Sequence, residues 1–168
     1  EAAQRSIASG RPWQATRALA PLLRGETPSD SLVTLLAARA AVAWEGWSAA
    51  ERLLAGASWL DGAFEGEGRA LLARARLERS NPALNAVTAV RAEAALEGAR
   101  ALDQRGADGA LAGLPLLVKD NTDVAGEVTN FGSRTMLGRP PADRSEVTVE
   151  RMVAAGAIVV GRTNTPEF

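Results

Sequence analysis

The amino-acid sequence predicts an all-α N-terminal part followed by a C-terminal part of the α/β class, in which helices flank a sheet. Two observations lead to this prediction. In the first half, alanine, leucine and arginine recur with the spacing of amphipathic helices. In the second half, two short apolar runs alternate with segments of helical periodicity, an order typical of helices packed on a sheet. We therefore expect helical hairpins over residues 1–79 and an α/β region over residues 80–168.

Two helices are well marked in the first half, and a third follows them. The first is expected over residues 32–43, with Asp30 or Ser31 as its N-terminal cap. The second begins at Trp47, and the third covers about residues 64–77. Each has apolar residues three and four positions apart, so that they lie on one face of the helix.

The first half also contains a repeat. Residues 12–15 resemble residues 46–49, at an offset of 34, and residues 35–40 resemble residues 71–76, at an offset of 36. Two helices in each period of about 34 residues resemble a tetratricopeptide-type array. Such arrays usually bind proteins, so a protein partner is expected, although no residue identifies it. An ordinary Ala/Leu-rich helical hairpin would explain the same pattern, and this alternative stays open.

Asn81-Pro82 is a helix-breaking pair that begins the second half. A long helix is then expected from Leu84 to Leu102, ending in a loop at residues 106–109. The continuous apolar run over residues 114–118 predicts a strand that is buried on both faces.

A further helix is expected over residues 143–155. Asp143 and Glu146 stand in the relation of a capping box, and Gly156 would end the helix. The apolar run over residues 157–160 predicts a second buried strand. Helix, strand, helix and strand in this order favour helices layered on a sheet.

The composition is that of a globular protein and excludes several classes of function. The chain has 168 residues, 46% of them hydrophobic and 23% charged, with a net charge of −1. This balance attracts neither nucleic acid nor an anionic membrane. No apolar run approaches the roughly 20 residues that a membrane span needs. No signal-peptide pattern is visible, which favours the cytoplasm. Because the chain begins with Glu1 instead of Met and ends at Phe168, directly after an apolar run and a Thr-Asn-Thr-Pro turn, we expect a fragment cut at both ends.

The residue types that are missing restrict the chemistry further. The chain has no cysteine, histidine or tyrosine. It therefore cannot contain a thiolate zinc site, a cysteine nucleophile or a Ser-His-Asp triad. Acid–base chemistry must use lysine, aspartate or glutamate. The carboxylates show no ligand-like clustering, so neither a metal nor a cofactor is expected.

Lys119 is the residue most suited to carry chemistry. It follows the apolar run of residues 114–118, where an ammonium group would lose water. Loss of water lowers the pKa of a lysine, which can then take a proton from a hydroxyl group. Ser-Lys variants of the catalytic triad work in this way. The alternative is a strand-end lysine that reaches solvent and pairs with Asp120 or Asp123. Periodicity alone would favour this alternative.

The residues around Lys119 favour catalysis. Residues 111–126, which include Val118-Lys119-Asp120-Asn121, closely resemble the segment that carries the catalytic lysine in the amidase signature family. The likeness covers about 88 residues, with its motifs in the family's order. The other matching segments are residues 81–87, 129–133, 141–143, 154–161 and 163–168.

This resemblance implies a mixed sheet with flanking helices and a Ser-Ser-Lys mechanism. A lysine accepts a proton through a bridging serine on a cis peptide bond, and a nucleophilic serine attacks an amide carbonyl group. Backbone N–H groups of a Gly-rich turn form the oxyanion hole, and water hydrolyses the acyl-enzyme. Lys119 corresponds to the lysine. Both serines belong to a Gly/Ser-rich motif after residues 163–168, so the chain is expected to stop before them and to be inactive alone.

Five more residues are candidates for active-site support. Asp120 and Asn121 could orient the lysine or bond the turn at Gly132-Ser133. Ser133 occupies a small-residue turn position of the family and is not the nucleophile, and we interpret it as a turn residue that satisfies local backbone groups. Asn164 could stabilise the active-site loop, although turn chemistry explains it equally well.

Two functional hypotheses follow. The first is a hydrolase of linear C–N amide bonds, acting on small-molecule or peptide amides or serving as a tRNA-dependent amidotransferase subunit. The second is a helical-repeat interaction module that carries a non-catalytic amidase remnant. Residues 70–80 fit both a repeat helix and the helix that precedes the amidase domain. The substrate is not specified, because most substrate-contacting loops of the family follow residue 168.

Overall fold

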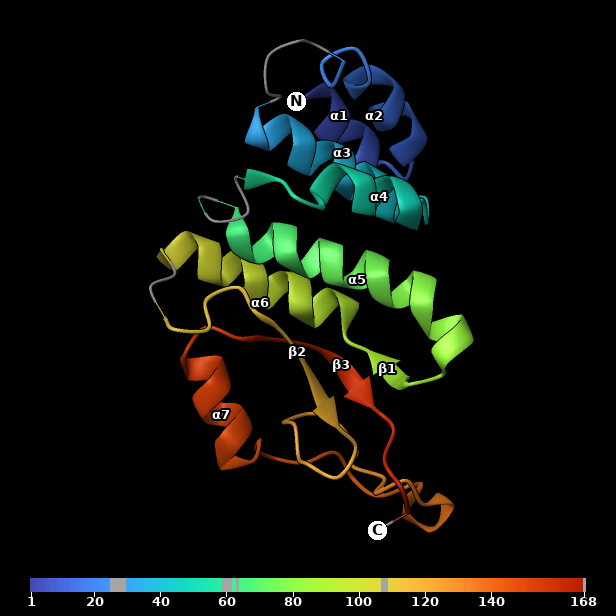
Figure 1. Cartoon of the computed structure of the whole chain (residues 1–168), viewed down its shortest axis with the longest axis vertical. Helices are drawn as coiled ribbons and strands as arrows, with labels where there is room; N and C mark the ends of the chain where they lie inside the picture. The colour runs from blue at the N-terminus through green and yellow to red at the C-terminus, as the bar shows by residue number, and fades with distance from the viewer. Residues whose placement is uncertain (25–29, 59–61, 63, 107–108, 168) are drawn as a thin grey trace.

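The computed structural model describes residues 1–24, 30–58, 62, 64–106 and 109–167, so that residues 107–108 of the expected loop lie outside this part. Figure 1 shows the N-terminal helices stacked at one end of the molecule, the long helices of residues 65–84 and 92–105 across its middle, and a small sheet with the helix of residues 147–154 at the other end. No helix in the described ranges is both long and apolar enough to cross a membrane.

The N-terminal helices pack on one another in chain order. Their pattern agrees with the expected starts: Asp30 caps α3 by accepting the Leu32 N–H at 2.9 Å, and α4 begins at Trp47. Helix α4 begins 35 residues after α2, and α5 begins 34 residues after α3. Kinship with tetratricopeptide repeats stays a prediction. The helices are α1 (Ala2–Ala8), α2 (Pro12–Leu19), α3 (Ser31–Ala43), α4 (Trp47–Leu54) and α5 (Glu65–Leu84).

The predicted helix break at Asn81-Pro82 is wrong, because α5 continues through it. Pro82 lies in the last, exposed turn, where water can satisfy the carbonyl that loses its N–H partner. The helix ends at Leu84, and Asn85, which caps it, is left-handed with φ 49°. The Asn81 side chain then accepts the Val87 N–H at 2.8 Å and fixes the start of the next element.

The prediction of one long helix from Leu84 to Leu102 is also wrong for the first residues of this range. Residues Val87–Val90 form strand β1, and helix α6 covers only Ala92–Arg105. The spacing of Val87 and Val90 suits a helix, but their β-branched side chains also suit a strand. Antiparallel pairing with residues 161–163 decides between the two.

The sheet is mixed, as the family resemblance implies. Strands β2 (Pro115–Lys119) and β3 (Ile158–Thr163) confirm the two predicted strands, and the order is β1-β3-β2. Strand β3 is parallel to β2 and antiparallel to β1. Helices α5 and α6 cover one face, and α7 (Val147–Ala154) covers the other.

Two details of these elements differ from expectation. Strand β2 is not buried on both faces, because Leu117 keeps 37% of its surface exposed beside α5. Helix α7 begins after Glu146, and no side chain caps it, so the expected capping box is wrong. Gly156, with φ 101°, follows the end of α7 as predicted.

Helix α5 joins the two halves of the molecule. Leu71 and Ala75 pack against α3 and α4, whereas Ala70 packs against α6 and β3. The expected boundary at residue 79 thus falls within a helix, and the division into two domains stays a prediction.

A buried ion-pair network reinforces this joint. Glu67 of α5 is 2% exposed and accepts hydrogen bonds from Arg39 of α3 at 2.7 and 2.5 Å and from Arg100 of α6 at 3.0 Å. Burial raises the pKa of Glu67, but the hydrogen bonds and charges of both arginines outweigh burial, and the net pKa lies below the usual 4.5. Asp103 of α6 also accepts the Glu67 N–H at 3.0 Å.

We expect Glu67→Gln to lower the free energy of unfolding by about 1.5–3 kcal/mol at pH 7, because charge-assisted hydrogen bonds are lost. A carboxylate whose pKa is lowered on folding stabilises the protein above its unfolded pKa, and this contribution disappears as pH falls through the folded pKa. The difference between variant and parent should therefore shrink below about pH 4.5. Urea unfolding from pH 3 to 8 measures both effects. Glu65→Gln is the control, because its partly exposed pair with Arg69 is worth at most about 1 kcal/mol.

Candidate active site

Lys119 is the only lysine of the chain and the last residue of β2, in register with Thr163 of β3. Its side chain is exposed, so the expected loss of water is wrong for this structure. Within the described ranges its amine has no hydrogen-bond or ion-pair partner. The alternative pairing with Asp120 or Asp123 is absent too, because both carboxylates are engaged elsewhere.

Asp120 is buried and bonds the neighbouring loop instead of Lys119. Its Oδ1 atom accepts a hydrogen bond from Nη2 of Arg162 at 2.9 Å and from the Asn130 N–H at 3.1 Å. Its carbonyl oxygen accepts the Phe131 N–H at 2.9 Å. One of the two roles expected for Asp120, bonding the following loop, thus agrees with the geometry.

Arg162 is a central residue of this network that sequence reasoning missed. It lies in β3 opposite Val118, and only 2% of it is exposed. Its Nη2 atom also lies 3.3 Å from the Thr129 hydroxyl oxygen, which donates to Asp123 at 2.7 Å. An arginine two positions after the apolar run of residues 157–160 was the available sign, but its partner became identifiable only through the pairing of β2 with β3.

The turn at residues 131–133 packs against the chain that follows β3. Phe131 and Gly132 are both left-handed, with φ 52° and 66°. Ser133 is buried, donates its hydroxyl to Glu167 at 2.6 Å, and caps the short helix η2 (Arg134–Met136). This geometry agrees with the interpretation of Ser133 as a turn residue.

Asn121 and Asn164 do not join the Asp120–Arg162 network. Asn121 is exposed and accepts the Thr122 hydroxyl at 3.2 Å. Asn164 donates its amide to the Asn85 carbonyl at 2.9 Å and so ties the end of β3 to the start of β1. Of the five predicted supporting residues, the structure brings together Asp120, Gly132 and Ser133.

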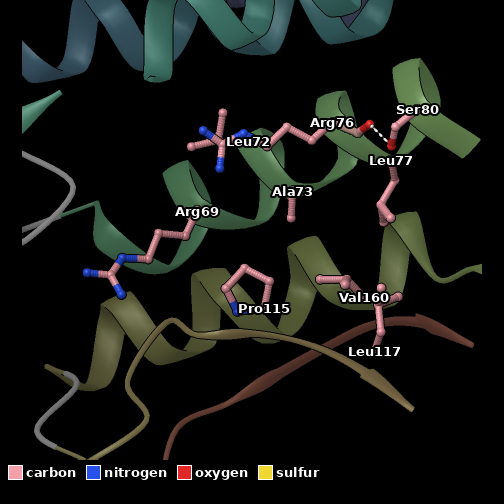
Figure 2. A pocket seen from close by; sticks show the side chains of 9 residues that line it. All are labelled: Arg69, Leu72, Ala73, Arg76, Leu77, Ser80, Pro115, Leu117 and Val160. Carbon is pink, nitrogen blue, oxygen red and sulfur yellow. Dashed lines mark hydrogen bonds between the residues drawn. The ribbon is translucent and has the colours of Figure 1, made fainter. Parts of the chain in front are cut away.

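An apolar groove of about 370 Å³ runs between α5 and β2. Figure 2 shows Leu77 of α5 directed toward Val160, with Leu117 close by. Because side chains alternate along a strand, Lys119 lies on the same face of β2 as Leu117. The groove therefore leads along the strand toward the lysine. Its lining residues are Arg69, Leu72, Ala73, Arg76, Leu77, Ser80, Pro115, Leu117 and Val160.

The apolar groove can bind an uncharged group, and Lys119 lies farther along the same face of β2, but among the residues that line the groove no nucleophile is held in position. Ser80, the serine of the groove, donates its hydroxyl to the Arg76 carbonyl at 2.7 Å. In the part of the chain that the structure describes, no group of three or more acidic side chains lies close enough to hold a metal ion. Proton acceptance by Lys119 stays a prediction.

Comparison with known proteins places these features in a family context. The family model described as Amidase matches residues 70–168. "Putative amidase AmiA2" of Mycobacterium tuberculosis is 47% identical over 95 residues, 55% of this chain and 19% of that protein. A glutamyl-tRNA(Gln) amidotransferase subunit of Nitratidesulfovibrio vulgaris is 43% identical over 96 residues, 56% of this chain and 19% of that protein. The chain thus spans about a fifth of these relatives.

Solved structures share the fold. A chain from a vestigial protein complex, described as revealing the evolutionary origins of an s-triazine catabolic enzyme, has a TM-score of 0.61 and 34% identity, over 65% of this chain and 25% of that chain. An amidase family protein from Bacillus anthracis has a TM-score of 0.60 and 24% identity, over 90% of this chain and 29% of that chain. The second likeness covers more than residues 70–168, so the shared fold includes part of the N-terminal helices.

We expect Gly132→Ala to destabilise the protein more than Gly126→Ala. Both glycines have positive φ, 66° and 79°, where a side chain costs about 1–2 kcal/mol. A Cβ at Gly132 would also lie 2.5 Å from the Thr165 carbonyl oxygen, whereas a Cβ at Gly126 meets nothing within 4 Å. The crowding adds about 1–3 kcal/mol at Gly132. Urea unfolding of the two variants measures the difference, and equal losses would contradict this packing of the turn.

Proposed function

Because this chain belongs to the amidase family, we propose that it forms the lysine-bearing part of a hydrolase that cleaves linear C–N amide bonds by a Ser-Ser-Lys mechanism. The observation that carries the proposal is the position of Lys119. It is the only lysine of the chain, it ends a strand inside the family match, and its amine has no partner among the described residues.

In this mechanism the amine of Lys119 acts as the base. It accepts a proton from a bridging serine, which in turn takes the proton of the nucleophilic serine as that oxygen attacks the amide carbonyl carbon. The C–N bond breaks, the leaving nitrogen receives a proton, and water releases the acyl group. The Gly/Ser-rich motif of the two serines is not among the 168 residues.

Asp120, Gly132 and Ser133 are proposed to support the site by holding the turn beside the lysine. Asp120 bonds Phe131 of the turn through its carbonyl oxygen, and its buried carboxylate bonds Asn130 and Arg162 of β3, which supports this assignment. Asn121 and Asn164 are proposed as more distant supports, at the strand end and at the start of β1. The substrates are proposed to be small-molecule or peptide amides, and the likeness to an amidotransferase subunit keeps a tRNA-dependent role as an alternative.

A helical interaction module is the second candidate function. Trp13 and Trp44 keep 52% and 43% of their surface exposed on the N-terminal helices, and large exposed aromatic side chains are frequent at protein interfaces. The repeated helix spacing supports the same proposal. A protein partner would then bind this end of the molecule, with or without catalysis at the other end.

The 168-residue chain should not hydrolyse a simple arylamide at a rate above background. A lysine can remove a proton, but without the serine motif no acyl acceptor is held beside it. Release of the arylamine by the purified chain measures this, with Lys119→Ala purified in parallel. Hydrolysis that persists unchanged in Lys119→Ala would show that another residue acts as the nucleophile and base.

In a protein that joins this chain to the serine motif, Lys119→Arg should lose nearly as much activity as Lys119→Ala. A guanidinium group stays protonated because its pKa is above about 12, so it keeps the charge and loses the base. Loss of a general base lowers the rate by about 10²–10⁴.

The pH dependence of kcat/KM for both variants checks this expectation. Because Lys119 is exposed and without a partner in the described structure, the two substitutions should change the free energy of unfolding of the 168-residue chain by no more than about 0.5 kcal/mol. Substantial activity in Lys119→Arg would mean that the positive charge matters and that the lysine is not the base.

A further inference from the structure

The ion pair of Arg162 and Asp120 is almost completely buried, and its contribution to the stability of the fold does not explain this burial. The side chains are 2% and 8% exposed, and Nη2 lies 2.9 Å from Oδ1. Within the described ranges, the Nε and Nη1 atoms of Arg162 are buried without a hydrogen-bond partner. Burying a guanidinium group and using one of its three nitrogens loses hydration that the contacts of Nη2 with Asp120 and Thr129 do not restore.

Stability therefore gives little reason for an arginine at this position. Well-packed apolar residues in place of a buried ion pair are often as stable or more stable. A local rule that is broken inside a protein often marks a functional constraint. The functional group closest in the chain is Lys119, which directly precedes Asp120.

The charge of Asp120 matters for this lysine. A carboxylate close to an ammonium group favours the charged form, and a charged lysine cannot accept a proton. Arg162 engages the carboxylate from the other side. The Asp120 carboxylate bonds Arg162, which lies opposite Val118, and Val118 packs against Val149 of α7. Lys119 follows Val118 in β2 and therefore lies on the other face of the strand.

Other charged side chains of the neighbouring loops and groove have hydrogen-bond or ion-pair partners. Glu167, which follows β3, accepts the Ser133 hydroxyl at 2.6 Å. Asp123 accepts the Thr129 hydroxyl at 2.7 Å. The arginines that line the groove on the lysine's face of β2 form ion pairs with glutamates of α5 and α4; these pairs are Arg69–Glu65 and Arg76–Glu51. Asp120 directly follows Lys119 in the chain, so its release from Arg162 is the change that we expect to affect the lysine.

We propose that Arg162 is a positioning residue that neutralises Asp120 and holds its carboxylate on the α7 face of the sheet, so that Lys119 keeps no acidic partner. The inference rests on the proposed function, in which Lys119 must be uncharged to accept a proton. Arg162 acts through Asp120 and needs no contact with the reacting atoms.

The test uses the 168-residue chain and the uncharged form of its single lysine. Trinitrobenzenesulfonate at pH 8 modifies only uncharged amines, and mass spectrometry separates the peptide of Lys119 from the N-terminus. Arg162→Gln should slow the modification of Lys119 about 3- to 10-fold, because the freed carboxylate favours the ammonium form. Asp120→Asn should accelerate it by a similar factor, because an unopposed cation disfavours that form. The double variant should react at the parental rate.

Arg144→Gln is the matched control, since it removes an exposed arginine that pairs with Glu150 and should leave the rate unchanged. If Arg162→Gln fails to fold, Asp120→Asn and the double variant decide the question. Unchanged rates in the folded single variants would overturn the proposal, and so would a double variant that reacts like either single one.

The labelling experiment requires no catalysis, so its outcome is separate from that of the proposed function. In a protein that joins this chain to the serine motif, full activity of Lys119→Ala would reject the amidase mechanism while leaving the labelling result intact. If Lys119→Ala is inactive there, Arg162→Gln should move the rise of kcat/KM to higher pH. An unmoved profile with equal activity would reject the positioning role alone.

Discussion

Strand β3 is the element on which the rest of the structure depends. It pairs with β1 on one side and β2 on the other, and five of its six residues are buried. Its two faces contribute to separate cores, one with α5 and α6 and one with α7. Register with β3 sets Lys119 opposite Thr163 and Val118 opposite Arg162, and these two pairings fix the geometry of the candidate site.

A second constraint joins this sheet to the N-terminal helices. Helix α5 has apolar residues on two sides and packs against both groups, so movement of one group would disturb the other. The Glu67 carboxylate crosslinks α3, α5 and α6 through two arginines. The likeness of 90% of this chain to an amidase family protein agrees with one continuous arrangement. Helix α5 forms one wall of the groove along β2, so the position of the groove depends on how α5 packs between the two groups.

Prediction from sequence succeeded where the determining interactions are local. The Asp30 cap, the start of α4 at Trp47, the glycine after α7 and both apolar strands depend on residues a few positions apart. It failed at Val87–Val90, where antiparallel pairing with residues more than 70 positions away overrides a helical spacing. That Lys119 is exposed could not be predicted, because exposure depends on which distant segments cover the strand end.

The sequence by itself determined the family, the presence of strands β2 and β3 and the identity of the single lysine, because these properties belong to continuous segments whose side chains and order carry the pattern. Tertiary structure alone decided that Asp120 is bonded to Arg162, 42 positions away, and that Lys119 is left without a partner in the described part of the chain. The physical reason is that electrostatic partners are chosen by strand register and burial. Neighbouring residues of an extended chain point to opposite faces, so Asp120 and Lys119 have different surroundings. The partner of Asp120 is the residue that the register of β3 brings next to it, which is Arg162.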